Sequence, residues 1–241
     1  MSVRIVFVGT SHGVPEPCRR CSSTMIEIGD RRYFIDMGTQ AIEDLISRGA
    51  PVDSVKGIFI THMHGDHTNG LISFVDLCSW YFQTADPLIL LPEVKAVDAI
   101  RAWLDATSSG LRDLRFEETR EGVCFDDGVL RVTAFRTKHN RCSYAYIIEA
   151  EGKSALFSGD LAGPSKDFPR AAVEMPLDLM ICESAHFSSL DYEPVFRESH
   201  AKRVIINHYA PWNLPNIIKL KDDLKDVVPV GMATDGLEIT L

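Results

Sequence analysis

The stretch Thr-His-Met-His-Gly-Asp-His at residues 61–67 decides how this chain is organised. It follows the apolar run Gly-Ile-Phe-Ile at residues 57–60, which predicts a short buried strand. The sequence therefore predicts a loop at a strand end that carries four candidate metal ligands, His62, His64, Asp66 and His67. Clustered nitrogen and oxygen donors suit divalent metals such as Zn²⁺, Mn²⁺ or Fe²⁺. Because adjacent side chains such as Asp66 and His67 project differently from His62 and His64, we expect two neighbouring ions rather than one.

Composition and charge narrow the class of protein. The chain has 241 residues, of which 45% are hydrophobic and 24% are charged, as in ordinary globular proteins. Its net charge of −9 argues against a broad basic surface for extended nucleic acid. No apolar run approaches the roughly 20 residues needed to cross a bilayer, and residues 1–9 predict a strand rather than a secretion signal. The six cysteines lie mostly in apolar runs, so we expect a reduced, cytoplasmic protein without a membrane segment.

Strand and helix patterns alternate along the chain, and no linker or low-complexity tract divides it. This organisation predicts a single α/β domain over residues 1–241. Helices are predicted over residues 39–47, over 70–82 with one broad buried face, from Pro92 to about Asp105, and over 214–227 with Asn213 as the cap. No element is predicted for the charged residues 108–127.

Polar side chains that can bind metals or carry protons recur where predicted strands stop. They are Asp36, His139, Asp160, Glu183, His186 and His208. Folding can bring such positions to one edge of the sheets, beside residues 61–67. A lone histidine is usually a core or surface residue, whereas several in register with a four-ligand cluster indicate a site.

The combined pattern resembles the metallo-β-lactamase superfamily. His-x-His-x-Asp-His at residues 62–67, followed by His139, Asp160 and His208, is similar to the full ligand set of that superfamily. Residues 61–71, Gly38-Thr39-Gln40 and the closing Asp-Gly-Leu-Glu look most like the branch of ribonuclease Z and related phosphodiesterases. The resemblance implies a four-layer αβ/βα sandwich, in which two mixed sheets lie face to face with helices outside and a dinuclear site at one sheet edge.

The resemblance also implies a role for each ligand. His62, His64 and His139 would bind the first metal. Asp66, His67 and His208 would bind the second, and Asp160 would bridge both. Zn²⁺ is the expected metal, with Mn²⁺ or Fe²⁺ as alternatives at the carboxylate-richer second position. A water or hydroxide between the ions would attack the substrate, and Asp66 lies close enough in sequence to orient it.

Further residues are candidates for roles around the metals. Asp36 and Glu183 are candidates to accept the second ring N–H of a ligand histidine, with a cap or turn as the alternative role for Asp36. His186 is a candidate proton donor to the leaving group, with an exposed loop histidine as the alternative, and His12 lies in a loop near the expected site mouth. Cys18-Arg-Arg-Cys21 has metal-clip spacing, but without a second such pair it predicts two free thiols. Trp80, Tyr81, Phe82 and Trp103 are interpreted as core or dimer contacts rather than a base-stacking platform.

The predicted substrate is a small anionic phosphodiester, such as a cyclic nucleotide or a head-group ester. Ribonuclease Z typically carries an arm that grips transfer RNA between the counterparts of His139 and Asp160, whereas only residues 140–159 intervene here. The alternatives are a lactonase or thioesterase-type hydrolase with Tyr209 as oxyanion donor, ribonuclease Z-like RNA processing, and a non-catalytic metal-binding protein. A homodimer is suggested by family analogy alone.

Overall fold

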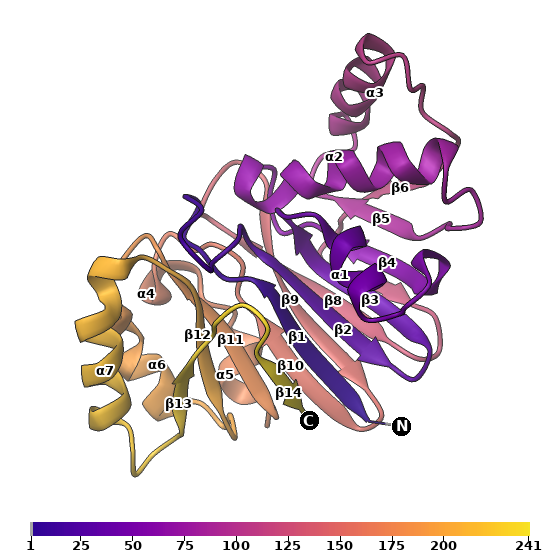
Figure 1. The fold of residues 1–241 in the computed structure, drawn as a ribbon. Coiled ribbons are helices and arrows are strands. Elements are labelled where there is room, and N and C mark those ends of the chain that lie inside the picture. The colour runs from indigo at the N-terminus through magenta and orange to yellow at the C-terminus, as the bar shows by residue number, and fades with distance from the viewer. Residues whose placement is uncertain (1) are drawn as a thin grey trace.

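The computed structural model describes residues 2–241 and contains two seven-stranded sheets packed face to face with helices on the outside (Figure 1). The strand order is β14-β1-β2-β3-β4-β5-β6 in the first sheet and β13-β12-β11-β10-β9-β8-β7 in the second. Helices α1–α3 cover the outer face of the first sheet, and α4–α7 cover that of the second (Figure 1). Both sheets join antiparallel and parallel strands. The predicted four-layer αβ/βα sandwich is confirmed.

The first sheet and its helices use the N-terminal half of the chain and the last strand. Their bounds are β1 (Val3–Gly9), β2 (Ser23–Ile28), β3 (Arg31–Met37), α1 (Ala41–Ser47), the 3₁₀ turn η1 (Val52–Ser54), β4 (Val55–Phe59), α2 (Gly65–Trp80), β5 (Leu88–Leu91), α3 (Ala96–Ala106), β6 (Arg115–Glu118) and β14 (Glu238–Thr240). Strands β1 to β3 form antiparallel pairs, whereas β3 to β6 run parallel. Parallel neighbours need crossovers, which α1, α2 and α3 provide on one face.

The second sheet uses the rest of the chain. Its elements are β7 (Gly122–Asp126), β8 (Arg131–Thr137), β9 (Ser143–Ala150), β10 (Lys153–Phe157), α4 (Pro164–Asp167), α5 (Arg170–Glu174), β11 (Leu179–Ser184), η2 (Ser189–Tyr192), α6 (Glu193–Glu198), β12 (Val204–Tyr209), η3 (Pro211–Asn213), α7 (Leu214–Asp223) and β13 (Val230–Met232). Strands β10, β11, β12 and β13 are parallel. Loops that follow their carboxyl ends therefore gather at one edge of the sheet.

The main core lies between the two sheets. It is built from inward-facing apolar and aromatic side chains of both, including Phe7, Ile26, Tyr33, Phe59, Tyr146 and Phe157. One further core lies under the helices of each outer layer. The central strands are covered on both faces, which explains why they read as continuous apolar runs rather than alternating ones. Burial of this surface drives the packing of the two sheets.

Several predicted element boundaries are wrong. Helix α2 begins at Gly65 rather than residue 70, because its first turn is polar and the apolar period starts only at Leu71. Helix α3 begins at Ala96, four residues after Pro92, and α7 ends at Asp223. Strands β6 and β7 occupy part of residues 108–127, where none was predicted. Both are largely exposed edge strands, so they lack the apolar run that signals a buried strand.

Three aromatic side chains interpreted as core or dimer contacts are exposed at the surface. They are Trp80, Tyr81 and Trp103. The core interpretation is therefore wrong for them, and the dimer interpretation stays a prediction. None of the six cysteines forms a disulfide within residues 2–241, and the expectation that Cys18 and Cys21 bind no metal stays a prediction. Within residues 2–241, no helix is both long enough and apolar enough to cross a bilayer.

Candidate metal centre

The predicted ligands come together at one end of the strands, with contributions from both sheets. Four come from the segment between β4 and the first turn of α2, which belong to the first sheet and its outer layer: His62, His64, Asp66 and His67. Three come from the second sheet, one each after β8, after β10 and within β12: His139, Asp160 and His208. Only His62 and His64 lie on a loop as predicted. Asp66 and His67 lie in the first turn of α2, where the helix dipole favours a carboxylate.

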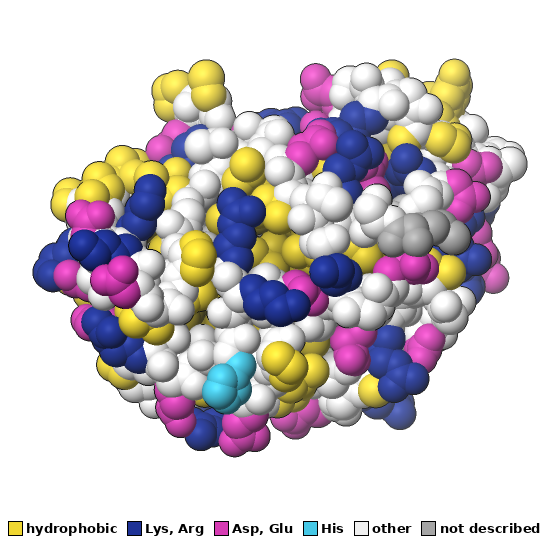
Figure 2. All heavy atoms as spheres, turned by 90° about the horizontal axis from the view of Figure 1, so that it is seen from below, with side chains coloured by type: hydrophobic (Ala, Val, Ile, Leu, Met, Phe, Trp, Pro, Cys, Tyr) yellow, Lys and Arg dark blue, Asp and Glu magenta, His cyan; other side chains and the backbone are white. Residues whose placement is uncertain are grey.

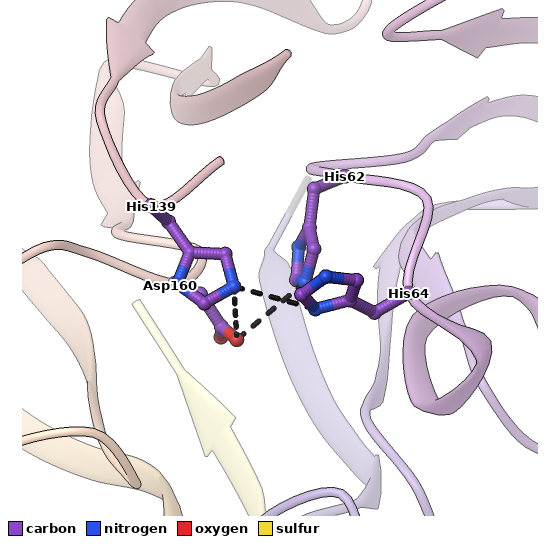
Figure 3. Close-up of side chains that lie close together, drawn as sticks. All are labelled: His62, His64, His139 and Asp160. Carbon is purple, nitrogen blue, oxygen red and sulfur yellow. Dashed lines mark hydrogen bonds and ion pairs between the residues drawn. The ribbon is translucent and has the colours of Figure 1, made fainter. Parts of the chain in front are cut away.

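The first group consists of His62, His64, His139 and Asp160, whose candidate ligand atoms all lie within 4.8 Å of one another (Figure 3). His62 Nε2 is 3.5 Å from Asp160 Oδ2, and His139 Nε2 is 3.6 Å from the same oxygen. His139 Nε2 is also 3.3 Å from His64 Nδ1. Figure 3 shows these side chains pointing toward one another from opposite sheets.

The second group consists of Asp66, His67 and His208. Asp66 Oδ2 is 3.3 Å from His67 Nε2 and 3.6 Å from His208 Nε2. The other oxygen of Asp160, Oδ1, lies 3.6 Å from His67 Nε2 and 3.5 Å from His208 Nε2. One oxygen of the Asp160 carboxylate therefore faces each group.

The donor atoms fit a pair of divalent cations. His62 Nε2, His67 Nε2 and Asp160 Oδ1 are buried and have no hydrogen-bond partner among residues 2–241. Buried polar atoms without partners are rare because they lose their hydration without compensation. Here the unpaired atoms all point into the two groups, and imidazole nitrogens with carboxylate oxygens are the ligands that borderline divalent metals prefer.

The electrostatics of the site agree with this fit. Burial lowers the pKa of His62 to about 2 and also lowers the pKa of His139, so these rings are neutral and keep a lone pair for a cation. Burial acts in the same direction on His67, but Asp36 and Asp160 together raise its pKa well above the usual value. The neighbouring carboxylates therefore favour a positive charge at His67 Nε2, and a bound cation would supply that charge in place of a proton.

Asp36 fixes the orientation of His67. Its Oδ2 lies 2.7 Å from His67 Nδ1, while Oδ1 accepts hydrogen bonds from the backbone N–H and the hydroxyl of Thr61 at 2.7 and 3.0 Å. Asp36 has φ = 58°, a backbone conformation that is uncommon outside glycine. This strained conformation places its carboxylate against His67 and Thr61. A Cβ at Gly38 would lie 1.7 Å from the Asp66 carbonyl oxygen, so glycine lets this turn approach α2. Asp36 therefore leaves His67 Nε2 free to bind a metal.

Glu183 does not contact a ligand histidine among the described residues, in contrast to the prediction. Its Oε1 lies 3.1 Å from His186 Nδ1 and accepts the N–H of Leu161, the residue after Asp160, at 3.0 Å. The hydrogen bond to Glu183 raises the pKa of His186. The His186 ring is 40% exposed and its Nδ1 is 3.7 Å from Asp160 Oδ2. His186 thus borders both the metal groups and solvent, and is not simply a solvent-facing loop residue.

One positioning residue, Asp167, was not predicted from the sequence. Asp167 Oδ2 accepts the backbone N–H of Lys138 at 2.6 Å and of Ala162 at 3.0 Å, while Oδ1 accepts that of Gly163 at 3.2 Å. One carboxylate thus ties the loop of His139 to the loop of Asp160. Nothing in the local sequence marks it, because the role depends on two loops that meet only in the fold.

Tyr209 is not placed to act as an oxyanion donor. Its side chain is buried, and its hydroxyl donates to the Ala233 carbonyl at 3.1 Å. The Arg19 guanidinium lies 3.9 Å from the centre of its ring. The packing interpretation of Tyr209 therefore holds.

Two facing mixed sheets with a histidine–carboxylate cluster at their common edge define a protein of the metallo-β-lactamase superfamily, of the ribonuclease Z-like branch. Within this superfamily, the model of the family described as "Anti-Pycsar protein Apyc1" matches residues 3–216, and the chain belongs to that family.

Curated relatives and solved structures place the chain among metallo-hydrolase folds. Ribonuclease Z of Crocosphaera subtropica is 26% identical over 163 residues, which is 66% of this chain and 52% of that protein. Ribonuclease Z of Limosilactobacillus fermentum is 33% identical over 153 residues, 61% of this chain and 49% of that protein. The chain spans about half the length of the curated relatives it matches.

Among solved structures, the short form of human tRNase Z superposes with a TM-score of 0.77 at 20% identity, covering 98% of both chains. Yeast PDE1 superposes with a TM-score of 0.75 at 14% identity, covering 100% of this chain and 99% of that chain. Likeness at these identities establishes the shared fold.

Proposed function

We propose that this chain is a metal-dependent hydrolase that cleaves small phosphodiesters. The observation that carries the proposal is the placement of Asp160, whose two oxygens face two separate groups of histidine and carboxylate donors. This is the arrangement needed to hold two cations side by side with one shared ligand. When bound, the pair would supply Lewis acidity and lower the pKa of a bound water.

The residues of the chain have distinct tasks in this proposal. His62, His64 and His139 would hold the first cation, and Asp66, His67 and His208 would hold the second. Asp66, whose Oδ2 faces the second group, would also orient the attacking water. His186 is oriented by Glu183 through Nδ1, which leaves Nε2 to donate a proton to the leaving oxygen. Zn²⁺ is the proposed metal because imidazole dominates the donor set, with Mn²⁺ or Fe²⁺ as the alternative in the second group.

A small substrate is favoured over transfer RNA. The segment between His139 and Asp160 is used by β9, β10 and the turn at Glu151-Gly152, which leaves no residues for an RNA-gripping arm. The face of the molecule seen from below in Figure 1 shows Lys and Arg side chains interspersed with Asp and Glu (Figure 2), in keeping with the net charge of −9. A cyclic nucleotide or a head-group diester is therefore the proposed substrate.

The test is hydrolysis of bis(p-nitrophenyl) phosphate by the metal-analysed protein, with and without added Zn²⁺ or Mn²⁺. A lactone and a transfer-RNA precursor serve as competing substrates. Asp66→Ala is expected to lower phosphodiester turnover by at least about 100-fold, since it removes a ligand and not merely its support. The matched control is Asp98→Ala on α3, an exposed carboxylate that should leave turnover unchanged.

The outcomes separate the candidate functions. Phosphodiester turnover that is lost in Asp66→Ala supports the proposal. Lactone opening or precursor cleavage without phosphodiester turnover would replace the substrate class. Fewer than two bound metals at saturation would remove the basis of the site itself.

A further inference from the structure

A small cavity borders the second metal group in the interior of the molecule. It encloses about 30 Å³ and is lined by residues of both sheets. Most of the lining residues are polar, and they include Thr24 and Asp36 on the side of the first sheet and Ser158, Asn207 and His208 on the side of the second. A buried water needs about 10–15 Å³ of such space and two to four polar partners. The size and the lining of the cavity therefore suit an ordered water.

Two buried polar atoms of the lining residues have no hydrogen-bond partner among residues 2–241. They are His208 Nδ1 and Asn207 Oδ1, and both residues are more than nine-tenths buried. Because His208 Nε2 lies 3.6 Å from Asp66 Oδ2 and 3.5 Å from Asp160 Oδ1, this nitrogen is the one that would bind the cation. The ring proton of His208 then lies on Nδ1. The two neighbouring side chains thus offer one donor and one acceptor.

The other buried candidate ligand histidines differ from His208 because a protein atom contacts their second nitrogen. His67 Nδ1 lies 2.7 Å from Asp36 Oδ2, and His62 Nδ1 lies 3.1 Å from Thr61 Oγ1. A ligand histidine almost always donates its second N–H to a carboxylate, a carbonyl or a water. At His208 no described protein atom takes this place, so water is the class of partner that fits.

A β-bulge brings Asn207 and His208 to the same cavity. Glu183 of β11 pairs with Asn207 and Ser184 pairs with Tyr209, so His208 is the extra residue of β12. Side chains of adjacent residues point to opposite faces in a regular strand, and a bulge breaks this alternation. His208 has φ = 45°, a strained conformation for a residue other than glycine. Such strain occurs preferentially at functional sites, and here it accompanies two adjacent side chains that share one cavity.

We propose that this cavity binds one ordered water, which accepts a hydrogen bond from His208 Nδ1–H and donates one to Asn207 Oδ1. Asn207 is then a positioning residue for the second metal group. The inference rests on the metal centre of the proposed function and deepens it. The water holds His208 in the tautomer that leaves Nε2 free for a cation, as Asp36 does for His67. Asn207 in turn fixes the position of the water.

A high-resolution crystal structure of the zinc-loaded protein tests the water directly. We expect one water within about 3.2 Å of both His208 Nδ1 and Asn207 Oδ1. A dry cavity, or a direct hydrogen bond between these two side chains, would overturn the proposal. The water can be observed whether or not the protein turns over a phosphodiester.

Replacing Asn207 by leucine tests the positioning role, because leucine has a similar volume and no acceptor. Chelator competition should show that Asn207→Leu weakens the second metal group by about 10-fold, the lower end of the range for a lost supporting partner, since this one acts through a water. The first group does not contain His208 and should keep its affinity. Asn207→Asp restores an acceptor oxygen and should recover the affinity that Asn207→Leu loses. Wild-type affinity of both groups in Asn207→Leu would overturn the positioning role.

The matched control is Asn213→Leu, at a buried asparagine that does not line the cavity. Its amide donates to the carbonyls of Ser184 and Phe187 at 2.9 and 2.7 Å. Asn213→Leu should lower the free energy of unfolding and leave both metal affinities unchanged. If it weakened the second group as much as Asn207→Leu does, the effect would reflect any lost buried amide and the proposal would fail. A wild-type protein with the water and two bound metals but without phosphodiester turnover would overturn the proposed function and leave this inference standing.

Discussion

Replacing Asp36 by asparagine tests the metal centre through a single hydrogen bond. Asparagine has the shape of aspartate but carries an acceptor and a donor in place of two acceptors. In Asp36→Asn the side-chain carbonyl oxygen must take the position of Oδ1, because the Thr61 N–H points at that position from 2.7 Å. The amide NH₂ then faces His67 Nδ1, which lies 2.7 Å from the present Oδ2. His67 Nδ1 must become an acceptor, and its proton moves to Nε2.

A protonated Nε2 cannot bind a cation, so the change in tautomer weakens the second metal group. Loss of such a supporting carboxylate typically weakens metal binding by about 10- to 100-fold, which corresponds to about 1.4–2.8 kcal/mol. The first group does not contain His67 and should keep its affinity. We therefore expect Asp36→Asn to hold one metal as tightly as wild type and the other more weakly by this factor. Competition with a chromophoric chelator, with metal counts after gel filtration, measures both constants.

The matched control is Asp127→Asn, at a partly buried carboxylate that also accepts several hydrogen bonds. Asp127 accepts from Arg31, Tyr33 and the N–H groups of Val129 and Leu130. It lies just before β8, and the seven residues of that strand place it about 20 Å from the His139 end. This variant should retain both metal affinities. Two tight metals in Asp36→Asn would refute the argument from tautomers, and equal weakening of both groups would show that the two groups do not bind independently.

Three further outcomes are expected. Asp167→Ala leaves three backbone N–H groups without their acceptor and should lower the free energy of unfolding by about 2 kcal/mol. It should also lower the affinity for metal at His139. Urea denaturation measures the first effect and chelator competition the second, and an unchanged affinity would mean that the loops are held by other contacts. Removal of metal by a chelator should lower Tm reversibly, since free metal at 100 times its Kd stabilises the folded state by about 2.7 kcal/mol per site. Calorimetry before and after addition of Zn²⁺ measures the shift in Tm, and an unchanged Tm would contradict metal binding. For Asp127, burial acts to raise the pKa, but hydrogen bonds from Leu130, Tyr33 and Val129 leave it below the usual value. A depressed pKa in the folded state adds stability only above the pKa of the unfolded state, near 3.9. Without metal, the free energy of unfolding of Asp127→Asn in urea should therefore lie below that of wild type by its full amount at pH 7, and the difference should shrink as the pH falls below about 4. A difference that does not depend on pH would contradict this assignment.

The convergence of the candidate ligands could be predicted from the sequence because each of these residues follows a strong local signal. His62 to His67 follow an apolar run, and His139, Asp160 and His208 each lie at or near the end of another. Strand ends meet at a sheet edge whatever the loop lengths, so the residues converge without knowledge of the detailed packing. The start of α2 was misplaced for a related reason. Its first turn is polar because it faces the candidate site rather than the core, and an apolar period cannot detect such a turn.

The supporting residues could not be predicted because their roles arise only in three dimensions. Asp167 looks like any surface carboxylate until the loops of His139 and Asp160 are seen to end beside it. Glu183 was correctly placed near the candidate site but assigned the wrong neighbour, since the turn after β11 directs its carboxylate to His186.

The division of the ligands between the sheets couples metal binding to the packing of the whole molecule. One predicted group joins His62 and His64 of the first half to His139 of the second, and the other joins Asp66 and His67 to His208. Neither group can assemble while the sheets are apart, so a bound cation would act as a cross-link between them and would contribute to the free energy of folding. Asp160 couples the two groups to each other as well, because its one carboxylate faces both of them. A sheet displacement that moves Asp160 must therefore disturb both groups at once, whereas the loss of Asp36 is confined to one.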